Sequence, residues 1–330
     1  MKKLVIIILS TCLSISVGFS QRIGVLMDSY VVERWMNDRY HICDQIKTLG
    51  GESIVEVANG NADVQVSQAK ALIDDGVKVL IVVPVDIQKG LEIVDYAQEK
   101  GVSVIAYDRI IPSENTDLYL SFDNEMVGEL QAKEALKHAG NGNYILINGP
   151  KSDYNAILFR KGQLKVLNPL VRKGEISIYK DIVLSNWSEL DAFLEMQEVV
   201  MKLDNEIVAI IAANDALASG VISALSSNEV SEKIYITGQD AEIEAIRNLK
   251  EGSQDMTIYK PIKELAYLAA ESAMKMANGK NIDQAKYSKI AGVEVKSILL
   301  KPMVVTVDNY METVVADGHV TIDELAGEDN

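Results

Sequence analysis

Residues 102–109 read VSVIAYDR, an apolar and β-branched run that ends on the charged pair Asp108 and Arg109. A continuous apolar run of this length after a glycine is typical of a parallel strand that is covered on both faces. The same pattern recurs in three further segments, residues 77–84, 208–215 and 234–240. Open parallel α/β sheets bind ligands beyond the carboxyl ends of their strands, so we expect the functional site at these four strand ends.

Segments with helical spacing of apolar residues alternate with the expected strands. The helix expected over residues 33–49, for example, carries Met36, Tyr40, Cys43 and Ile46 at helical spacing. Strands that alternate with such helices predict a parallel, doubly wound sheet. The alternation runs to residue 122 and then starts again. We therefore predict an α/β protein of two similar Rossmann-like lobes that face each other across a ligand-binding cleft.

The first 20 residues, MKKLVIIILSTCLSISVGFS, have a basic start, an apolar middle and small residues at the end, as secretory signal peptides do. Cys12 has a second interpretation as a lipid-modified cysteine, but the apolar residues continue to Phe19 and favour cleavage near Ser20. No later segment holds the roughly 20 uninterrupted apolar residues of a membrane span. We expect an exported, soluble product.

The bulk composition argues against several classes of function. The 330 residues carry a formal net charge of −16, which would repel nucleic acids and anionic membranes. Three histidines and two cysteines, with no C-x-x-C pair, offer little material for a metal site. The chain has no G-x-S-x-G, no phosphate-binding loop and no G-x-G-x-x-G turn. We expect neither an enzyme nor a bound cofactor.

The remaining polar and aromatic residues suit a polyol ligand. Sugar hydroxyls accept hydrogen bonds from cationic and amide groups and donate to carboxylates, and the C–H faces of a sugar pack on aromatic rings. The candidate binding residues are Arg34, Trp35, Asp108, Arg109, Asn155, Trp187, Asn214, Asp240 and Lys260. Seven of them also have a structural interpretation: Asp108 and Arg109 as a surface ion pair, the two asparagines as helix N-caps, the two tryptophans as core residues and Lys260 as part of a solvated turn.

Eight segments carry a resemblance to a known family. They are ERW (33–35), ANGN (58–61) with Gln68 downstream, AYDR (106–109), SFDNEMVGELQAK (121–133), NAILFRKGQLKVL (155–167), AANDA (212–216), GQDA (238–241) and MTIYKPI (256–262). In this order they resemble the periplasmic sugar-binding proteins of bacterial ABC transporters, and among these the members that bind D-xylose. The resemblance covers nearly all of the chain after the signal peptide.

The resemblance implies two lobes of the periplasmic binding protein type I fold, joined by a hinge of three crossings. The crossings would fall near residues 121–124, 259–261 and 301–305. The N-terminal lobe would comprise residues 21–122 and 261–303, and the C-terminal lobe residues 123–260 and 304–330. Carried over residue by residue, the ligand contacts of the family fall on the same nine candidate residues. The resemblance departs around residues 27–32 and 184–190, which flank Trp35 and Trp187.

The resemblance also implies a function. We expect a monomeric periplasmic protein that captures a monosaccharide, D-xylose, in its cleft and delivers it to an inner-membrane ABC permease. An alternative of another class is a sensory subunit that presents the sugar to a membrane histidine kinase or chemoreceptor. The effector half of a transcription regulator shares this fold, but the signal peptide and the lack of a preceding helix-turn-helix oppose it. A sugar-processing enzyme is the remaining alternative.

Overall fold

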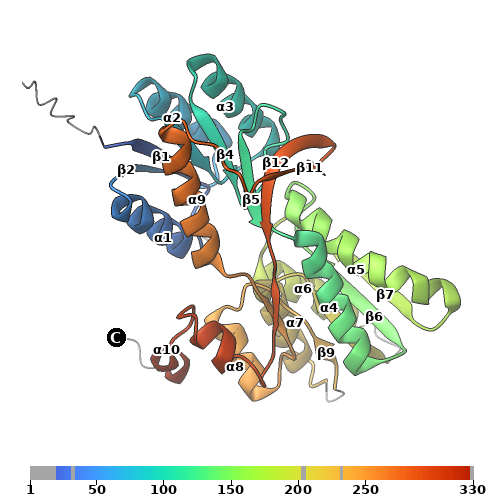
Figure 1. Ribbon diagram of the computed structural model, residues 1–330. Helices are drawn as coiled ribbons and strands as arrows, with labels where there is room; N and C mark the ends of the chain where they lie inside the picture. The colour runs from blue at the N-terminus through green and yellow to red at the C-terminus, as the bar shows by residue number, and fades with distance from the viewer. Residues whose placement is uncertain (1–19, 31–33, 202–205, 231–232, 328–330) are drawn as a thin grey trace, which may run out of the picture.

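The computed structural model describes residues 20–30, 34–201, 206–230 and 233–327 (Figure 1). The expected signal peptide, including Cys12, lies outside the described residues apart from Ser20. Within the described residues the chain forms an α/β fold with two main sheets, as predicted. None of the described helices has both the length and the apolar composition needed to cross a membrane.

The first sheet has seven strands in the spatial order β11–β12–β5–β4–β3–β1–β2. Their bounds are β1 (Arg22–Met27), β2 (Glu52–Val57), β3 (Val79–Val82), β4 (Ser103–Tyr107), β5 (Leu118–Phe122), β11 (Lys286–Ile290) and β12 (Val293–Leu300). All neighbouring pairs are parallel except β11 and β12, which are antiparallel. The parallel part was predicted, whereas the antiparallel edge strand β11 was not.

Helices cover both faces of this sheet. One face carries α1 (Arg34–Thr48) and α9 (Ile262–Ala277), and the other carries α2 (Ala62–Asp74) and α3 (Ile87–Lys100). Successive residues of a strand point to opposite faces. Thus Val25 and Met27 of β1 pack with the α1 and α9 face, while Leu26 packs with the α2 and α3 face.

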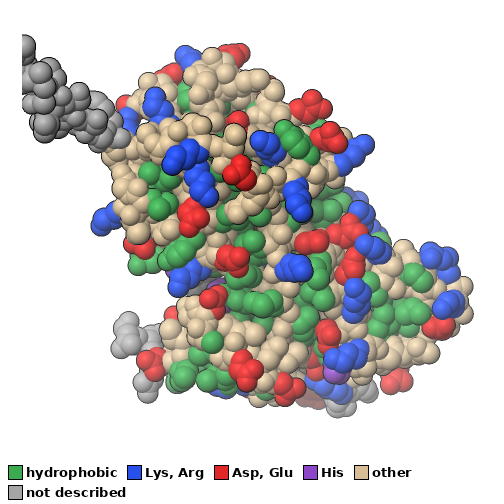
Figure 2. Space-filling view, viewed as in Figure 1, with side chains coloured by type: hydrophobic (Ala, Val, Ile, Leu, Met, Phe, Trp, Pro, Cys, Tyr) green, Lys and Arg blue, Asp and Glu red, His purple; other side chains and the backbone are tan. Residues whose placement is uncertain are grey.

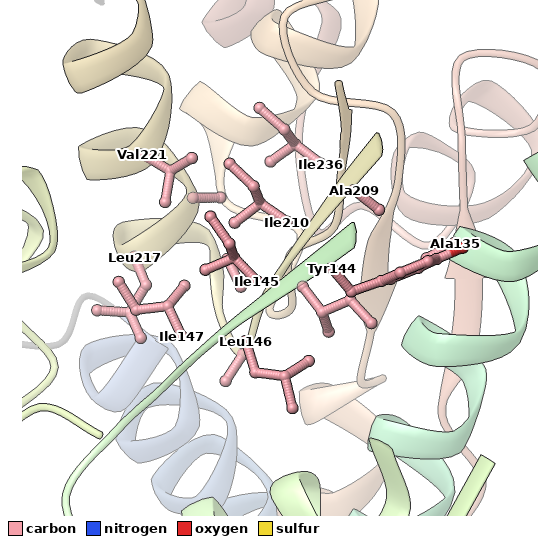
Figure 3. Close-up of a cluster of buried hydrophobic side chains, with 14 of the residues drawn as sticks. Ala135, Tyr144, Ile145, Leu146, Ile147, Ala209, Ile210, Leu217, Val221 and Ile236 are labelled. Atoms are coloured by element: carbon pink, nitrogen blue, oxygen red, sulfur yellow. The ribbon is translucent and has the colours of Figure 1, made fainter. Parts of the chain in front are cut away.

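The second sheet has four parallel strands in the order β7–β6–β8–β9. Its strands are β6 (Asn143–Asn148), β7 (Ser177–Val183), β8 (Ile207–Ala212) and β9 (Tyr235–Ile236), and its helices are α4 (Asn124–Ala139), α5 (Tyr154–Lys173), α6 (Glu189–Met201), α7 (Asp215–Ser227) and α8 (Ile243–Glu251). Figure 3 shows the core around β6, where Tyr144 extends toward Ala135 of α4 and Ile147 lies toward Leu217 of α7. This alternation buries both faces of the strand.

The chain passes between the two sheets at three places. It leaves the first sheet after β5, returns to it after β10 (Thr257–Tyr259) and leaves it again between β12 and β13 (Met303–Val305). Two of these passages touch, because the backbone N–H of Asp123 donates to the carbonyl of Leu300 at 2.9 Å. We therefore keep, as a proposal, the division into a first lobe of residues 21–122 and 261–303 and a second lobe of residues 123–260 and 304–330.

The last described segment packs against α8 within the second lobe. It contains a short π-helix (Met311–Val315) and α10 (Ile322–Ala326), which form a small apolar cluster with α8. The Thr321 hydroxyl and the Glu324 carboxylate form a reciprocal capping box at the start of α10. Neither element was predicted.

The predicted apolar face of α1 is wrong in part. Ile46 is buried as predicted, but Met36 and Tyr40 are 48% and 64% exposed, and Trp35 and Ile42, outside the predicted set, are buried. The buried face also contains Arg34 and Asp38. Two charged residues on the inner face hide its hydrophobic period, so spacing alone placed Met36 and Tyr40 on it.

The surface carries both signs of charge despite the acidic total. On the face shown in Figure 2, Asp and Glu side chains are interspersed with Lys and Arg. Along α4 and α5 they form ion pairs, including Lys165 with Glu125 at 2.9 Å and with Glu129 at 2.6 Å. Exposed pairs of this kind contribute about 1 kcal/mol or less to stability.

Candidate ligand-binding site

A cavity of about 260 Å³ lies where the carboxyl ends of the strands in both lobes meet. All nine candidate binding residues named from the sequence line it. Five further residues also line it, namely Asp153, Phe159, Ala216, Gln239 and Glu242. The structure thus gathers residues that are up to 226 positions apart, from Arg34 to Lys260, around one volume.

Arg34 forms the charged centre of the cavity wall. Its Nη2 lies 3.1 Å from Asp108 Oδ1, its Nε lies 3.2 Å from Asp38 Oδ2 and its Nη1 lies 3.9 Å from Asp240 Oδ1. Burial opposes the charge, but these three carboxylates raise the pKa of Arg34 well above its usual value. Arg34 is therefore a permanent cation.

Asp108 sits in a strained backbone conformation at the end of β4. Its φ of 61° lies in the left-handed region that non-glycine residues rarely adopt. Its carbonyl accepts hydrogen bonds from the hydroxyls of Ser121 at 2.8 Å and Tyr119 at 3.1 Å, which hold the turn. Burial would raise the pKa of the Asp108 carboxyl, but Arg34 and the nearby cations outweigh it and lower the pKa. The buried carboxylate is therefore ionised.

Asp240 and Lys260, both from the second lobe, form a second ion pair at the cavity. Lys260 Nζ lies 3.1 Å from Asp240 Oδ1, and both side chains are largely buried. Asp240 also has a positive φ, 99°, and its backbone N–H donates to the carbonyl of Ile258 at 2.8 Å. The Lys260 ammonium lies 5.8 Å from the ring centres of Phe122 and Phe159, within the range of a cation–π attraction.

The two tryptophans supply flat apolar surfaces. Trp35 is only 3% exposed, and its buried Nε1 has no hydrogen-bond partner among the described residues. Trp187 donates from Nε1 to Asp153 Oδ2 at 3.2 Å. The indole of Trp187 rests against Gly149, where an added Cβ would lie 2.5 Å from the ring. Only glycine leaves room for the ring in this position.

The two asparagines have different structural roles. Asn214 is the N-cap of α7, because its Oδ1 accepts from the backbone N–H of Leu217 at 3.0 Å. Asn155 is not a cap. Its Oδ1 accepts from Asn124 Nδ2 at 2.8 Å, and its Nδ2 donates to Asp108 Oδ2 at 3.1 Å. Asn155 therefore connects the first lobe to the second.

Several residues of the site were missed. Asp153 precedes α5 and caps it, so it has the sequence pattern of an ordinary N-cap. Phe159 belongs to the periodic apolar face of the same helix. His319 lies behind the site, where its Nε2 is 3.2 Å from the carbonyl oxygen of Asp240. Gln239 could have been predicted from the sequence, because it directly precedes Asp240 at a strand end.

The site offers a dense mixture of donors, acceptors and flat rings. Three cations and several carboxylates lie within one small volume, and the carboxylate of Asp108 is reached by side chains of both lobes. Within the described ranges, no group of three or more His, Cys, Asp or Glu side chains is arranged to hold a metal ion.

Comparison with known proteins adds independent information. The chain is 40% identical to the D-xylose-binding periplasmic protein of Escherichia coli (strain K12) over 304 residues, which is 92% of each chain. Two solved structures are also similar. A carbohydrate transporter solute-binding protein from Chloroflexus aurantiacus in complex with D-glucose has a TM-score of 0.87 and 26% identity, covering 92% of this chain and 98% of that chain.

The second similar solved structure is an ABC transporter solute-binding protein from Clostridium phytofermentans with bound β-D-glucose. It has a TM-score of 0.85 and 28% identity, and the match covers 92% of this chain and 99% of that chain. The family model for the periplasmic binding protein domain matches residues 23–281. These matches and the two-lobed α/β fold agree, and the chain belongs to the periplasmic binding protein family.

Proposed function

We propose that the protein binds one free monosaccharide, D-xylose, in the cavity between its lobes and delivers it to an inner-membrane ABC permease. The observation that carries the proposal is the convergence of cations, carboxylates, amides and two indoles from both lobes on one cavity. The 40% identity to a protein named for D-xylose binding supports the choice of sugar. The nine candidate residues are proposed as the ligand contacts.

The size and polarity of the cavity favour a single sugar ring. Its volume of about 260 Å³ is just below the range of about 300–1,000 Å³ that holds drug-sized ligands. Asp108 and Asp240 would accept hydrogen bonds from hydroxyls, and Arg34, Arg109 and Lys260 would donate them. Hydrogen bonds to charged groups each contribute about 1.5–3 kcal/mol. The two indoles would pack on the C–H faces of the sugar.

Ligand-driven closure follows from the placement of these groups. Arg34, Trp35, Asp108 and Arg109 belong to the first lobe, while Asn155, Trp187, Asn214, Asp240 and Lys260 belong to the second. A sugar that touches both sets is bound far more tightly by the closed form than by the open form. It therefore shifts the equilibrium toward closure about the three crossings. A binding role of this kind requires no chemical change in the sugar.

The deciding experiment is direct identification of the ligand. Freshly purified protein is denatured, and the released small molecules are identified by mass spectrometry. Isothermal titration of the stripped protein then compares D-xylose with D-ribose, L-arabinose and D-glucose. We expect D-xylose to bind most tightly. A preference for D-glucose, the sugar bound in the two similar structures, would overturn the choice of sugar but not the binding role.

Delivery to a permease and presentation to a sensor use the same sugar site. A pull-down from membranes with the sugar-loaded protein separates the two roles, because a permease or a histidine kinase would be recovered and identified. We expect the permease. Recovery of a histidine kinase or chemoreceptor instead would favour the sensory alternative.

A further inference from the structure

Arg109, Asp153 and Trp187 form a wall between two cavities. The three residues line the 260 Å³ cavity described above, and they also line a second cavity of about 250 Å³. The second cavity is otherwise bounded in part by exposed residues, including Ser152 and Asn186. The first cavity is lined mainly by buried side chains. The wall is therefore shared by the two cavities, and the second cavity reaches exposed residues.

The carboxylate of Asp153 holds this wall together. Its Oδ2 lies 3.4 Å from Arg109 Nε and accepts the hydrogen bond from Trp187 Nε1. Its Oδ1 accepts from the backbone N–H of Asn155 at 2.9 Å and caps α5. The Asp153 and Arg109 side chains are only 10% and 18% exposed. One carboxylate thus connects an arginine of the first lobe with an indole and a helix start of the second.

Arg109 has a second carboxylate partner, which lies in its own lobe. Its Nη1 lies 2.7 Å from Asp28 Oδ2, and Asp28 belongs to the same lobe as Arg109. When the lobes separate, the pair with Asp28 can persist, whereas the pair with Asp153 has to break. Of the two ion pairs of Arg109, only the one with Asp153 therefore depends on closure.

We propose that Asp153 is a gate residue, a positioning residue whose pairing with Arg109 shuts the wall between the cavities and slows the escape of bound sugar. The inference rests on the proposed function, because it concerns the same sugar site. The gate acts on the closed form only. Removing the Asp153 charge should therefore raise the dissociation rate and leave the association rate nearly unchanged, as is usual when a buried charge pair loses one partner.

The test variant is Asp153→Asn in the complete protein. Asparagine caps helices about as well as aspartate, so α5 keeps its start, but the oxygen that faces Arg109 and accepts from Trp187 is replaced by an uncharged NH2 group. Stopped-flow indole fluorescence gives both rate constants with whichever sugar the wild-type protein binds. We expect the dissociation rate to rise about tenfold and the association rate to stay within about twofold, as for a buried charge pair that has lost one partner. A dissociation rate within about twofold of wild type would overturn the proposal.

Asp28→Asn is the matched comparison, because it removes a carboxylate from the same arginine within one lobe. Small-angle X-ray scattering of the sugar-free proteins gives the radius of gyration as a measure of opening. We expect Asp153→Asn to be more open than wild type and Asp28→Asn to be unchanged, and equal opening of both variants would overturn the gate. The scattering experiment uses sugar-free protein, so it tests the role of Asp153 even if the wild type binds no sugar. Failure of the wild type to bind any sugar would therefore refute only the proposed function.

Discussion

Asn155 Nδ2 donates a hydrogen bond of 3.1 Å to Asp108 Oδ2 and so joins the second lobe to the first. The amide of Asn155 is oriented by Asn124, whose Nδ2 donates to the Asn155 amide oxygen. The same Asp108 carboxylate pairs with Arg34 through its other oxygen. A sugar hydroxyl that reaches Asp108 therefore meets a carboxylate whose position is already fixed from both sides, which lowers the entropy cost of binding.

Replacing Asp240 or Arg109 by alanine should weaken sugar binding at least about tenfold, because each loses a charge-assisted hydrogen bond worth about 1.5–3 kcal/mol. Asp240→Ala also leaves the buried Lys260 ammonium without its 3.1 Å partner. Isothermal titration measures the affinity. Lys133→Ala, on the exposed side of α4, is the control and should bind as wild type does. Near-normal binding by both site variants would refute the proposed contacts.

Gly149→Ala should displace the Trp187 indole, because the new Cβ would lie 2.5 Å from the ring. Loss of the stacking surface should cost about 1 kcal/mol, or roughly fivefold in affinity. The emission spectrum of the tryptophans should shift as well, because the displaced ring meets a different environment. A shifted spectrum together with unchanged affinity would show that the ring does not contact the sugar.

The stability should fall as the pH rises from about 4 to about 7 because of Asp215. Burial, with a contribution from the charge of Asp240, raises the pKa of Asp215 from 3.8 to about 7. Between these values the folded protein holds a proton that the unfolded chain has released. The folded state therefore loses stability with rising pH, with a slope of up to about 1.4 kcal/mol per pH unit.

Urea unfolding at several pH values between 4.5 and 7.5 measures this dependence. Asp215→Asn removes the titrating group and should flatten the slope, although it also weakens the bonds from Gln254 and Thr257 and so lowers the overall stability. The comparison concerns the slope alone. An equal slope in the variant would assign the pH dependence to other groups.

Gly162→Ala should destabilise the second lobe. An added Cβ would lie 2.0 Å from the carbonyl oxygen of Glu125, where α4 and α5 cross closely. Overpacking against backbone costs about 1–3 kcal/mol or more, which exceeds the roughly 1 kcal/mol gain in helix propensity. Gly90→Ala is the matched control in α3, where the new Cβ meets only the Ile111 side chain at 3.1 Å. Chemical denaturation should show a clearly larger loss for Gly162→Ala.

The sequence allowed the parallel sheets to be predicted because their strands are continuous apolar runs between glycines and polar ends. Residues 102–109 are the clearest example, since Tyr107 ends β4 and the next two residues enter the cavity. The edge strand β11 escaped prediction because its residues are mostly exposed and polar. Helix α8 is amphipathic, but it was not predicted because it is short and because its N-cap residue, Glu242, makes no side-chain capping hydrogen bond.

Several of the candidate residues could be named because a strand end concentrates polar side chains at one edge of the sheet. What spacing could not reveal is pairing across the cleft. Asp153 has the sequence pattern of a helix cap, and only the fold brings its second oxygen to Arg109. The burial of Asp38 was also not predicted: its pair with Arg34 lies within α1, but its second partner, the Tyr107 hydroxyl, comes from β4.

The antiparallel pairing of β10 with β13 has a consequence for movement. Thr257 pairs with Val305 and Tyr259 pairs with Met303, so two of the three connecting segments form one ribbon. Segments tied in this way cannot swivel separately, and each is followed or preceded by a proline, Pro261 and Pro302, which stiffens the joint. The two lobes should therefore rotate about a single hinge axis and not sample a broad range of relative orientations.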